Sequence, residues 1–307
     1  MAWRAAAALC LLPALWPAQA LPGLGRFELW AADVGQGSAV LVRTRHHALL
    51  HDTGPTLGPG DDAGQRVVQP LLRSLGVDRL DELVLSHRDQ DHVGGAASLL
   101  RDWPVGRLRH SLEPQHPLLR QAQGAQRLPC QAGAHWVWDG VDFAVLHPTR
   151  PGAEVDGRTN AASCVLRVRD ATGRAALLTG DIGVAEEAAL LTRDPSALRS
   201  EVLVVPHHGS RSSSSRPFIV AVAPHWAVIQ VGYRSRFGHP HAEVLSRFEA
   251  LGIDVVRTDW CGAWVWREDG AVCTRLVRHR IWHDVKAATP SAERGPLVAI
   301  TDAGDPE

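Results

Sequence analysis

Apolar residues recur along the chain in short runs of strand length, separated by turns and by segments with a helical period. These runs predict β-strands at residues 27–32, 39–43, 47–50, 83–85, 135–138, 142–146, 163–169, 174–179, 202–205, 226–231 and 253–257. Apolar spacings of three and four predict helices at residues 63–75, 94–101, 183–192, 217–221 and 242–251. Residues 262–266 and 271–276 predict a hairpin. Strands and helices mix in both halves, so we expect an α+β fold in which helices cover two sheets.

The two ends of the chain depart from this pattern. A weakly basic start, an apolar run over residues 5–16 and the sequence Ala18-Gln19-Ala20 predict a secretory signal peptide over residues 1–22. The alternative is the remnant of a membrane helix, and both interpretations place the rest of the chain outside the cytoplasm. We expect one domain over residues 23–279 and a polar tail over residues 280–307. Residues 111–133, rich in Gln and Pro, are expected to form a surface excursion.

Composition excludes several classes of protein. Of the 307 residues, 45% are hydrophobic and 21% are charged, which excludes a disordered chain, a coiled coil and a polytopic membrane protein. The formal net charge is −1, so a polyanionic partner would have to be bound locally, by a patch or a metal ion. Four cysteines follow the leader, without a C-x-x-C pair, and three pairings are open to them: Cys130, Cys164, Cys261 and Cys273.

The most specific signal is the sequence Ser-His-Arg-Asp-Gln-Asp-His at residues 86–92. Two imidazoles and two carboxylates lie within six residues, directly after a buried strand whose rigid end presents the loop. Alternate residues of an extended loop share a side, so His87, Asp89 and Asp91 can converge while His92 turns to a second metal ion. A solvated turn is the alternative, but chance rarely places four metal-binding side chains at this spacing.

Two further strands end in candidate ligands. Residues 176–181 end in Asp181, whose two carboxylate oxygens could bridge two cations, or which could cap the following helix. Residues 204–210 place His207 and His208 after another buried strand. Adjacent side chains diverge, so we expect one of them, His207, to bind metal and His208 to face the substrate or support the ligands. A surface pair of histidines is the alternative.

Other polar residues could bind substrate or support the ligands. Asp33, in a glycine-rich turn, and Asp52, at a strand end, could hydrogen-bond a metal-binding histidine. Residues 211–216 could hold phosphate through hydroxyls, guanidiniums and backbone amides, or form a flexible polar loop. His239 is a candidate catalytic residue, and His147 is a further ligand or a histidine satisfied by hydrogen bonds. The candidate substrate-binding residues are Asn160, Ser163, Ser210, Arg211 and Ser212.

In combination, H-x-D-x-D-H, G-D and P-H-H-G-S resemble the metallo-β-lactamase superfamily. With D-V-G-Q-G, L-L-H-D-T-G, N-A-A-S-C-V-L-R and F-G-H-P-H, the set resembles the C-terminal domain of ComEC-type DNA-uptake (competence) proteins. This resemblance, over about residues 26–275, implies a four-layer αββα sandwich with a dinuclear site between the sheets. It assigns His87 and Asp89 to one metal ion, Asp91 and His92 to the other, Asp181 as the bridge, and His207 to the second site.

Two positions depart from the family pattern. Ser38 stands where the family usually continues D-V-G-Q-G with Asp. The histidine of the third superfamily motif has no obvious counterpart, and Asn160 or His147 stands in its region. Asp89 also replaces a histidine that many family hydrolases carry, and this harder oxygen ligand favours Mn²⁺ or Mg²⁺ without excluding Zn²⁺.

The resemblance implies a metal-dependent nuclease that cleaves DNA phosphodiesters during uptake, with water activated by two divalent ions, Zn or Mn. Asp91, His208 and His239 are the expected catalytic residues. The expected partners are DNA, single-stranded by preference, and a membrane DNA-uptake channel, with no nucleotide cofactor. The expected location is periplasmic, either secreted or tethered to the outer face of the cytoplasmic membrane. The alternatives are a secreted hydrolase of another phosphoester or a lactam, and a non-catalytic scaffold of an uptake complex.

Overall fold

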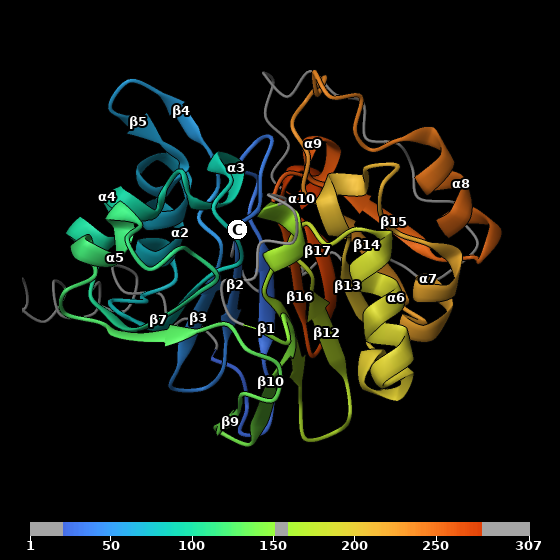
Figure 1. Ribbon diagram of the computed structural model, residues 1–307, viewed down its shortest axis with the longest axis horizontal. Coiled ribbons are helices and arrows are strands. Elements are labelled where there is room, and N and C mark those ends of the chain that lie inside the picture. The colour runs from blue at the N-terminus through green and yellow to red at the C-terminus, as the bar shows by residue number, and fades with distance from the viewer. Residues whose placement is uncertain (1–20, 151–158, 278–307) are drawn as a thin grey trace, which may run out of the picture.

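The computed structural model describes residues 21–150 and 159–277, in which two large sheets face each other (Figure 1). The first sheet has eight strands in the order β17-β16-β1-β2-β3-β6-β7-β8. They are β1 (Glu28–Ala31), β2 (Val40–Arg43), β3 (Ala48–His51), β6 (Leu80–Leu85), β7 (Val105–His110), β8 (Gln126–Pro129), β16 (Trp264–Arg267) and β17 (Gly270–Cys273). The second sheet has seven strands in the order β15-β14-β13-β12-β11-β10-β9. They are β9 (His135–Trp138), β10 (Val141–His147), β11 (Val165–Arg169), β12 (Ala175–Leu178), β13 (Val202–Val204), β14 (Trp226–Ile229) and β15 (Asp254–Arg257).

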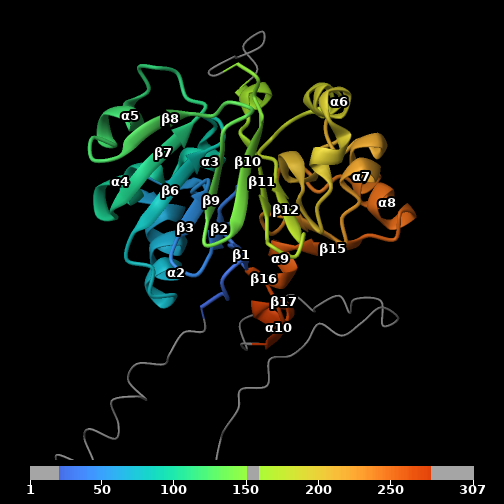
Figure 2. The same cartoon turned by 90° about the horizontal axis from the view of Figure 1, so that it is seen from below.

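Helices cover the outer face of each sheet, and Figure 2 shows the resulting layers edge-on. The first sheet carries α2 (Gln69–Ser74), α4 (Ala96–Asp102) and α5 (Pro117–Gln121), and the second carries α6 (Val184–Arg193), α7 (Arg216–Val222) and α8 (Ala242–Ala250). Shorter elements are the hairpin of β4 (Thr56–Gly58) and β5 (Asp61–Asp62), α3 (Gln90–Val93), α9 (Thr258–Cys261), α10 (Thr274–Val277), a π-helical turn (Gly64–Val68), and 3₁₀ turns at Thr159–Ala162, Pro195–Leu198 and Pro206–Gly209.

Three apolar clusters fill the spaces between these layers. One lies between the sheets and includes the fully buried Leu29, Phe143 and Trp264. The other two lie between each sheet and its own helices. Both faces of each sheet are therefore buried, which explains why its central strands read as nearly continuous apolar runs. The predicted four-layer αββα sandwich is confirmed.

One predicted segment was wrong. Residues 111–133 are not a simple surface excursion, because they contain α5 and β8, the edge strand of the first sheet. Leu118 and Leu119 of α5 are buried in the cluster beneath the helices. The polar composition of the segment hid these elements, since an edge strand and a short amphipathic helix each bury few side chains.

Two disulfides select one of the three cysteine pairings. Cys130 is bonded to Cys164, which joins the end of β8 in the first sheet to the start of β11 in the second. Cys261 is bonded to Cys273 beside the hairpin of β16 and β17. Disulfides persist in oxidising compartments, so this pairing suggests an extracytoplasmic protein.

None of the helices in the described ranges is both long and apolar enough to cross a membrane. The predicted leader, except for residues 21–22, and the predicted tail lie outside the described residues.

Candidate metal centre

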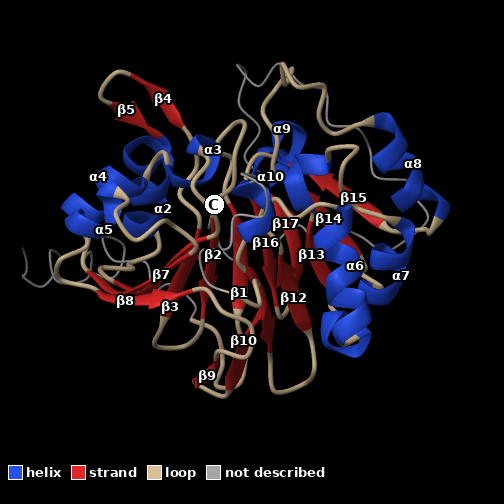
Figure 3. Cartoon of the chain, viewed as in Figure 1, coloured by secondary structure: helices blue, strands red, loops and turns tan. Residues whose placement is uncertain are grey.

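The candidate ligands follow strands that run parallel in the two sheets. In the first sheet β3, β6 and β7 are parallel, and in the second β12, β13, β14 and β15 are parallel. The carboxyl ends of parallel strands meet at one edge of a sheet, where ligand sites of such sheets form. Asp52 and residues 86–92 follow β3 and β6, whereas Asp181 and residues 207–208 follow β12 and β13. Figure 3 shows the short helix α3 at this edge, between the two sheets.

The loop after β6 is extended only as far as Asp89, which has φ −67° and ψ 145°. The helix α3 then begins, so a helical turn rather than the expected extended loop brings Asp91 and His92 into the site. The glycine-rich turn of residues 35–37 packs against this helix, and the Ser38 N–H donates to the carbonyl of Asp91 at 3.0 Å. A Cβ at Gly37 would lie 2.3 Å from the same carbonyl oxygen, so this approach requires glycine.

Four side chains form a compact cluster whose candidate ligand atoms all lie within 4.8 Å of one another: Asp91, His92, Asp181 and His208. The Nε2 atom of His92 lies 3.0 Å from Oδ1 of Asp181, and Nε2 of His208 lies 3.2 Å from Oδ2 of Asp91. The other Asp181 oxygen, Oδ2, lies 3.7 Å from His208 Nε2. The two oxygens of Asp181 therefore face different imidazoles of the cluster.

Hydrogen bonds on the far side of each ring fix the direction of its lone pair. Ser86 Oγ donates to Asp52 Oδ2 at 2.8 Å and so has no proton left for His87. His87 Nδ1 must then donate to Ser86 Oγ at 2.9 Å, which leaves the lone pair on Nε2. His92 Nδ1 donates to Asp52 Oδ2 at 2.7 Å, and His208 Nδ1 donates to the backbone carbonyl of Gln230 at 2.8 Å.

Within the described ranges, Nε2 of His87, His92 and His208 is buried without a hydrogen-bond partner. Three anchored imidazoles that leave an unsatisfied Nε2 beside carboxylates are typical of a metal site, where the other ring nitrogen donates to a carboxylate or a carbonyl. These residues fit a divalent cation, because they offer mixed nitrogen and oxygen donors.

Electrostatics favour charge within the cluster. Burial alone would raise the pKa of Asp181, but His92 and His208 lower it well below its usual range. Burial would likewise lower the pKa of His92, whereas Asp181 and Asp52 raise it well above the ordinary value. The carboxylates and the imidazoles thus each favour the charged form of the other. A divalent cation bound there would supply positive charge to the same carboxylate oxygens.

A second pair lies beside this cluster. His87 Nε2 is 3.7 Å from Oδ2 of Asp89, whose side chain is 39% exposed. The proximity of His87 is the main cause that lowers the pKa of Asp89. These two residues are the ones that the sequence assigned to a separate metal ion.

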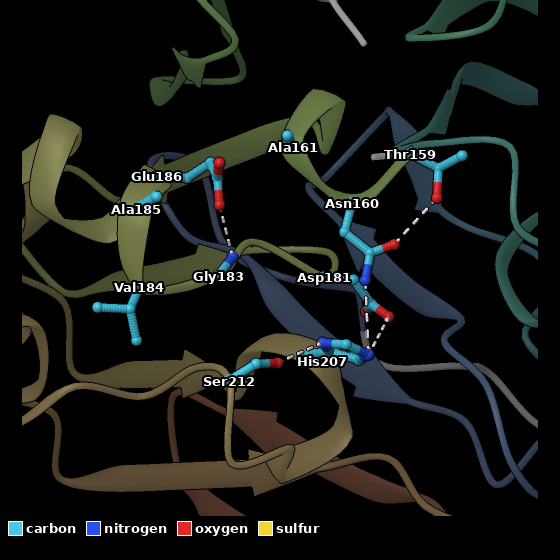
Figure 4. Close-up of a pocket in the computed structure, with 10 residues that line it drawn as sticks. All are labelled: Thr159, Asn160, Ala161, Asp181, Gly183, Val184, Ala185, Glu186, His207 and Ser212. Atoms are coloured by element: carbon cyan, nitrogen blue, oxygen red, sulfur yellow. Dashed lines mark hydrogen bonds and ion pairs between the residues drawn. The ribbon is translucent and has the colours of Figure 1, made fainter. Parts of the chain in front are cut away.

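His207 and His208 point differently, although both have left-handed φ angles, 52° and 53°. His208 is buried within the cluster, whereas the side chain of His207 is 28% exposed and its Nε2 lies 3.8 Å from Asp181 Oδ2. The Nδ1 of His207 contacts Ser212 Oγ at 3.2 Å, and its Nε2 lies 3.4 Å from Asn160 Nδ2 (Figure 4). The structure thus brings His208, not the favoured His207, into the four-residue cluster.

A pocket of about 400 Å³ opens beside His207. Figure 4 shows Asn160, Asp181 and Ser212 converging on the His207 ring from the lining of this pocket. Of the predicted substrate-binding residues, Asn160 and Ser212 therefore lie at the pocket. Ser210 contacts Ser212 at 3.0 Å, and Arg211 is exposed and contacts His241.

Three predicted residues have other roles. Ser163 is fully buried and cannot contact substrate; its hydroxyl accepts from the Asp181 N–H at 3.0 Å and holds the ligand loop. Asp33 pairs with Arg275 at 2.6 Å instead of supporting a ligand histidine. His147 Nε2 donates to the carbonyl of Ala161 at 2.8 Å, as a satisfied histidine does.

Sequence reasoning missed several supporting residues. His51 is buried, lies 3.4 Å from Asp52 Oδ2, and contacts the carbonyl of Cys164 at 3.0 Å. Gln230 is buried and donates to two backbone carbonyls of the glycine-rich turn region, while Ser38 Oγ donates to Gln230. His51 and Ser38 lie inside quoted motifs, but nothing in the sequence marked Gln230 except its position after a buried strand.

The family model of the metallo-beta-lactamase superfamily matches residues 32–232, which contain every residue of the cluster. The chain belongs to the metallo-beta-lactamase superfamily. Two solved structures share this fold: Igni18, a metallo hydrolase of Ignicoccus hospitalis, and YhfI, a metallo-beta-lactamase fold protein of Bacillus subtilis. The first has a TM-score of 0.52 at 15% identity and the second 0.50 at 12% identity. Each covers 78% of this chain and 99% of its own.

This metallo-beta-lactamase domain is related to competence proteins. Competence protein ComA of Neisseria gonorrhoeae is 42% identical over 231 residues, which cover 75% of this chain and 31% of that protein. ComE operon protein 3 of Bacillus subtilis is 32% identical over 269 residues, which cover 81% of this chain and 34% of that protein. The chain thus spans about a third of the length of these relatives.

Proposed function

We propose that this chain is a metal-dependent nuclease that hydrolyses DNA phosphodiesters during DNA uptake. The observation that carries the proposal is the convergence of three buried, unsatisfied Nε2 atoms on carboxylates at the edge of the two sheets. The relationship to competence proteins supports DNA as the substrate. The two disulfides support an extracytoplasmic location, in the periplasm, with the protein either secreted or tethered to the outer face of the cytoplasmic membrane.

We assign one divalent ion, Zn or Mn, to Asp91, His92, Asp181 and His208. A second is assigned to His87 and Asp89, with Asp181 as the bridge and His207 as its fourth side chain. Divalent ions held there supply Lewis acidity toward the phosphoryl group and a nucleophile at neutral pH. This oxygen-rich set of ligands favours Mn²⁺ more than a histidine-rich set does.

The chain's own residues would bind the phosphodiester and deliver a proton. Asn160, Ser212 and Arg211 offer an amide, a hydroxyl and a guanidinium to the phosphate oxygens beside His207. His239 is a histidine that we do not assign as a metal ligand. Its ring centroid lies 5.8 Å from that of His207 and 6.5 Å from that of His208. Its Nδ1 is buried and has no hydrogen-bond partner among the described residues, and we assign this ring to protonate the leaving oxygen.

The test is cleavage of labelled single- and double-stranded DNA by the protein loaded with Mn²⁺ or Zn²⁺. We expect metal-dependent cleavage that is lost in His87→Ala and in Asp181→Ala, because each change removes a ligand. Val137→Ala, on the exposed surface of β9, is the matched control and keeps full activity. No cleavage by a protein that nevertheless binds metal would contradict the DNA substrate, and a protein that binds no metal would favour a scaffold.

A further inference from the structure

The loop of residues 232–240, between β14 and α8, places exposed aromatic rings next to the metal centre. Tyr233 and Phe237 are each 55% exposed. Among the described residues, only Trp260 is a further aromatic with comparable exposure, at 39%. Exposed apolar side chains that gather in a patch mark interaction sites, so two rings in one short loop point to a ligand or a partner.

The loop reaches the site through a short series of rings. Phe237 stacks on His239 with centroids 5.9 Å apart, and His239 lies 5.8 Å from His207 and 6.5 Å from His208. One side chain, that of His239, thus separates Phe237 from His208 of the cluster. The pocket beside the cluster is also lined by His207.

The loop is held in place rather than free. The Ser235 hydroxyl donates to Gln36 Oε1 at 2.8 Å, and the Gly232 N–H donates to the same oxygen at 3.4 Å. A Cβ at Gly232 would lie 2.9 Å from the backbone nitrogen of Gln36. A fixed platform loses less conformational entropy when it binds a ligand than a mobile loop does.

Charge around the rings favours a polyanion. Residues 206–218 and 230–242 contain four arginines and no acidic residue: Arg211, Arg216, Arg234 and Arg236. Arg234 lies over the Tyr233 ring at 5.2 Å, and Arg236 lies over the Phe237 ring at 4.9 Å. An exposed cation–π contact is worth only about two- to fivefold in an equilibrium constant, so a stacking base can displace it and free the guanidinium for phosphate.

We propose that Tyr233 and Phe237 form a stacking platform for unpaired nucleobases, which feeds single-stranded DNA to the metal centre. Every base has a flat face that can stack on an aromatic ring, while the neighbouring arginines track the backbone. A base paired within a duplex is stacked on its neighbours and does not present that face. The inference rests on the proposed nuclease function and specifies its substrate, because the platform selects unpaired strands.

The experiment measures binding of three labelled oligomers of equal length in EDTA, which prevents cleavage: single-stranded DNA, duplex DNA and an abasic strand. The abasic strand keeps the phosphates and lacks the bases. We expect the single strand to bind more tightly than the other two. Phe237→Ala and Tyr233→Ala should each weaken that binding about tenfold and leave the abasic strand unchanged.

Matched variants separate stacking from packing. Phe237→Trp should retain binding because it keeps the stacking surface, whereas Phe237→Leu should lose it despite similar apolar area. Val137→Ala, at another exposed apolar position, should change nothing. Equal affinity for the single strand and the abasic strand, or no effect of the ring variants, would overturn the proposal and assign the loop to a protein partner. No measurable single-strand binding at about 100 μM protein would overturn it as well.

A second measurement keeps this inference distinct from the proposed function. Hydrolysis of bis(p-nitrophenyl) phosphate with Mn²⁺ reports the metal centre without DNA bases. If that hydrolysis is absent while base-dependent binding is present, the nuclease proposal fails and the platform remains. If hydrolysis is present and base-dependent binding is absent, the platform fails and the hydrolase remains.

Discussion

At the scale of single residues, Asp52 organises the polar network behind the metal centre. Its carboxylate accepts from the backbone and hydroxyl of Ser86 and from Nδ1 of His92. Burial alone would raise the pKa of Asp52, but His51 and His92 lower it, so the carboxylate stays ionised. This charge fixes the tautomer of one ring directly and of a second ring through Ser86.

We expect Asp52→Asn to weaken metal affinity by about 10- to 100-fold. The amide of Asn would point an N–H at one of the groups whose hydrogen bonds the carboxylate accepts. Competition with a chelator of known affinity measures the change. Asp170→Asn is the matched control, because Asp170 is also a buried carboxylate. It lies in the turn after β11 and accepts hydrogen bonds from Arg26 and Thr172. Equal losses in both variants would mean that Asp52 acts only on overall stability.

We expect different effects from replacing the two adjacent histidines, His207 and His208. His208→Ala should lose the ion assigned to the four-residue cluster, because it removes a buried Nε2 that lies 3.2 Å from Asp91. His207→Ala should retain that ion, since His207 is partly exposed and lies outside the cluster. Metal content after dialysis measures both. Retention by His208→Ala together with loss by His207→Ala would restore the assignment made from the sequence.

This choice could not be made from the sequence. Both histidines have left-handed φ angles, and which ring turns inward depends on the carbonyl of Gln230, 22 residues away. The motifs at residues 86–92 and at Asp181 were recognisable because their residue types and spacing are specific by themselves. Orientation, by contrast, depends on partners from other strands.

At the scale of elements, Asp139 joins turns of the two sheets. It lies in the turn between β9 and β10 and accepts from Thr44 Oγ1 at 2.6 Å and from the His46 N–H at 2.8 Å, both in the turn between β2 and β3. Burial would raise the pKa of Asp139, but these hydrogen bonds and those from the imidazoles of His46 and His47 lower it far below its ordinary value.

A carboxyl group whose pKa is lowered by folding stabilises the fold above its unfolded pKa, near 3.8, and loses that contribution as the pH falls below it. We expect Asp139→Asn to be less stable than the wild type at neutral pH, with a difference that narrows in acid. Asn suits the left-handed φ of 52° at this position. Urea unfolding across this pH range measures the difference, and a difference that is constant with pH would contradict the account.

Asp61→Asn is the matched control for that series. Asp61 pairs with Arg66 at 2.7 Å on the surface, and exposed ion pairs contribute little. Its stability should follow the wild type at every pH.

The disulfide between Cys130 and Cys164 should support the site as well as the fold. It closes a separation of 34 residues, against 12 for Cys261 and Cys273. Loop entropy predicts that replacing both partners with Ser costs about 4 kcal/mol for the first pair and about 3 kcal/mol for the second.

Cys164 also follows Ser163, which holds the loop of Asp181. We therefore expect weaker metal retention only in the Cys130→Ser, Cys164→Ser double variant. Urea unfolding and metal content measure the two effects, and equal metal retention in both double variants would contradict the link to the site.

Most elements could be predicted from apolar periodicity, because both sheets are covered on both faces and their strands read as apolar runs. β7 was missed because Arg107 and Arg109 alternate with its few apolar residues, and β8 because it is short and polar. Arg109 of β7 pairs with the buried Glu82 at 2.6 Å and lies over the Trp136 ring, a tertiary environment that no local pattern reveals. The pairing of the cysteines likewise depended on tertiary structure, because Cys130 follows the edge strand β8 of one sheet and Cys164 precedes β11 of the other.

At the scale of the whole molecule, the net charge is small, but the charged residues are unevenly distributed. The net charge of −1 would not attract DNA. The loops after β13 and β14, which lie beside the cluster, contain arginines and no acidic residue. A local field of this kind would direct a polyanion to one edge of the sandwich. The relationship to competence proteins supports our proposal that the partner is a membrane DNA-uptake channel.

The central claim is that the edge between the sheets holds two divalent ions on the residues assigned here. An anomalous difference map from crystals of the Mn²⁺-loaded protein tests it most directly. We predict one peak among Asp91, His92, Asp181 and His208, and a second beside His87 and Asp89, with Asp181 between them. A map without peaks at these residues, or with peaks only elsewhere, would contradict the account.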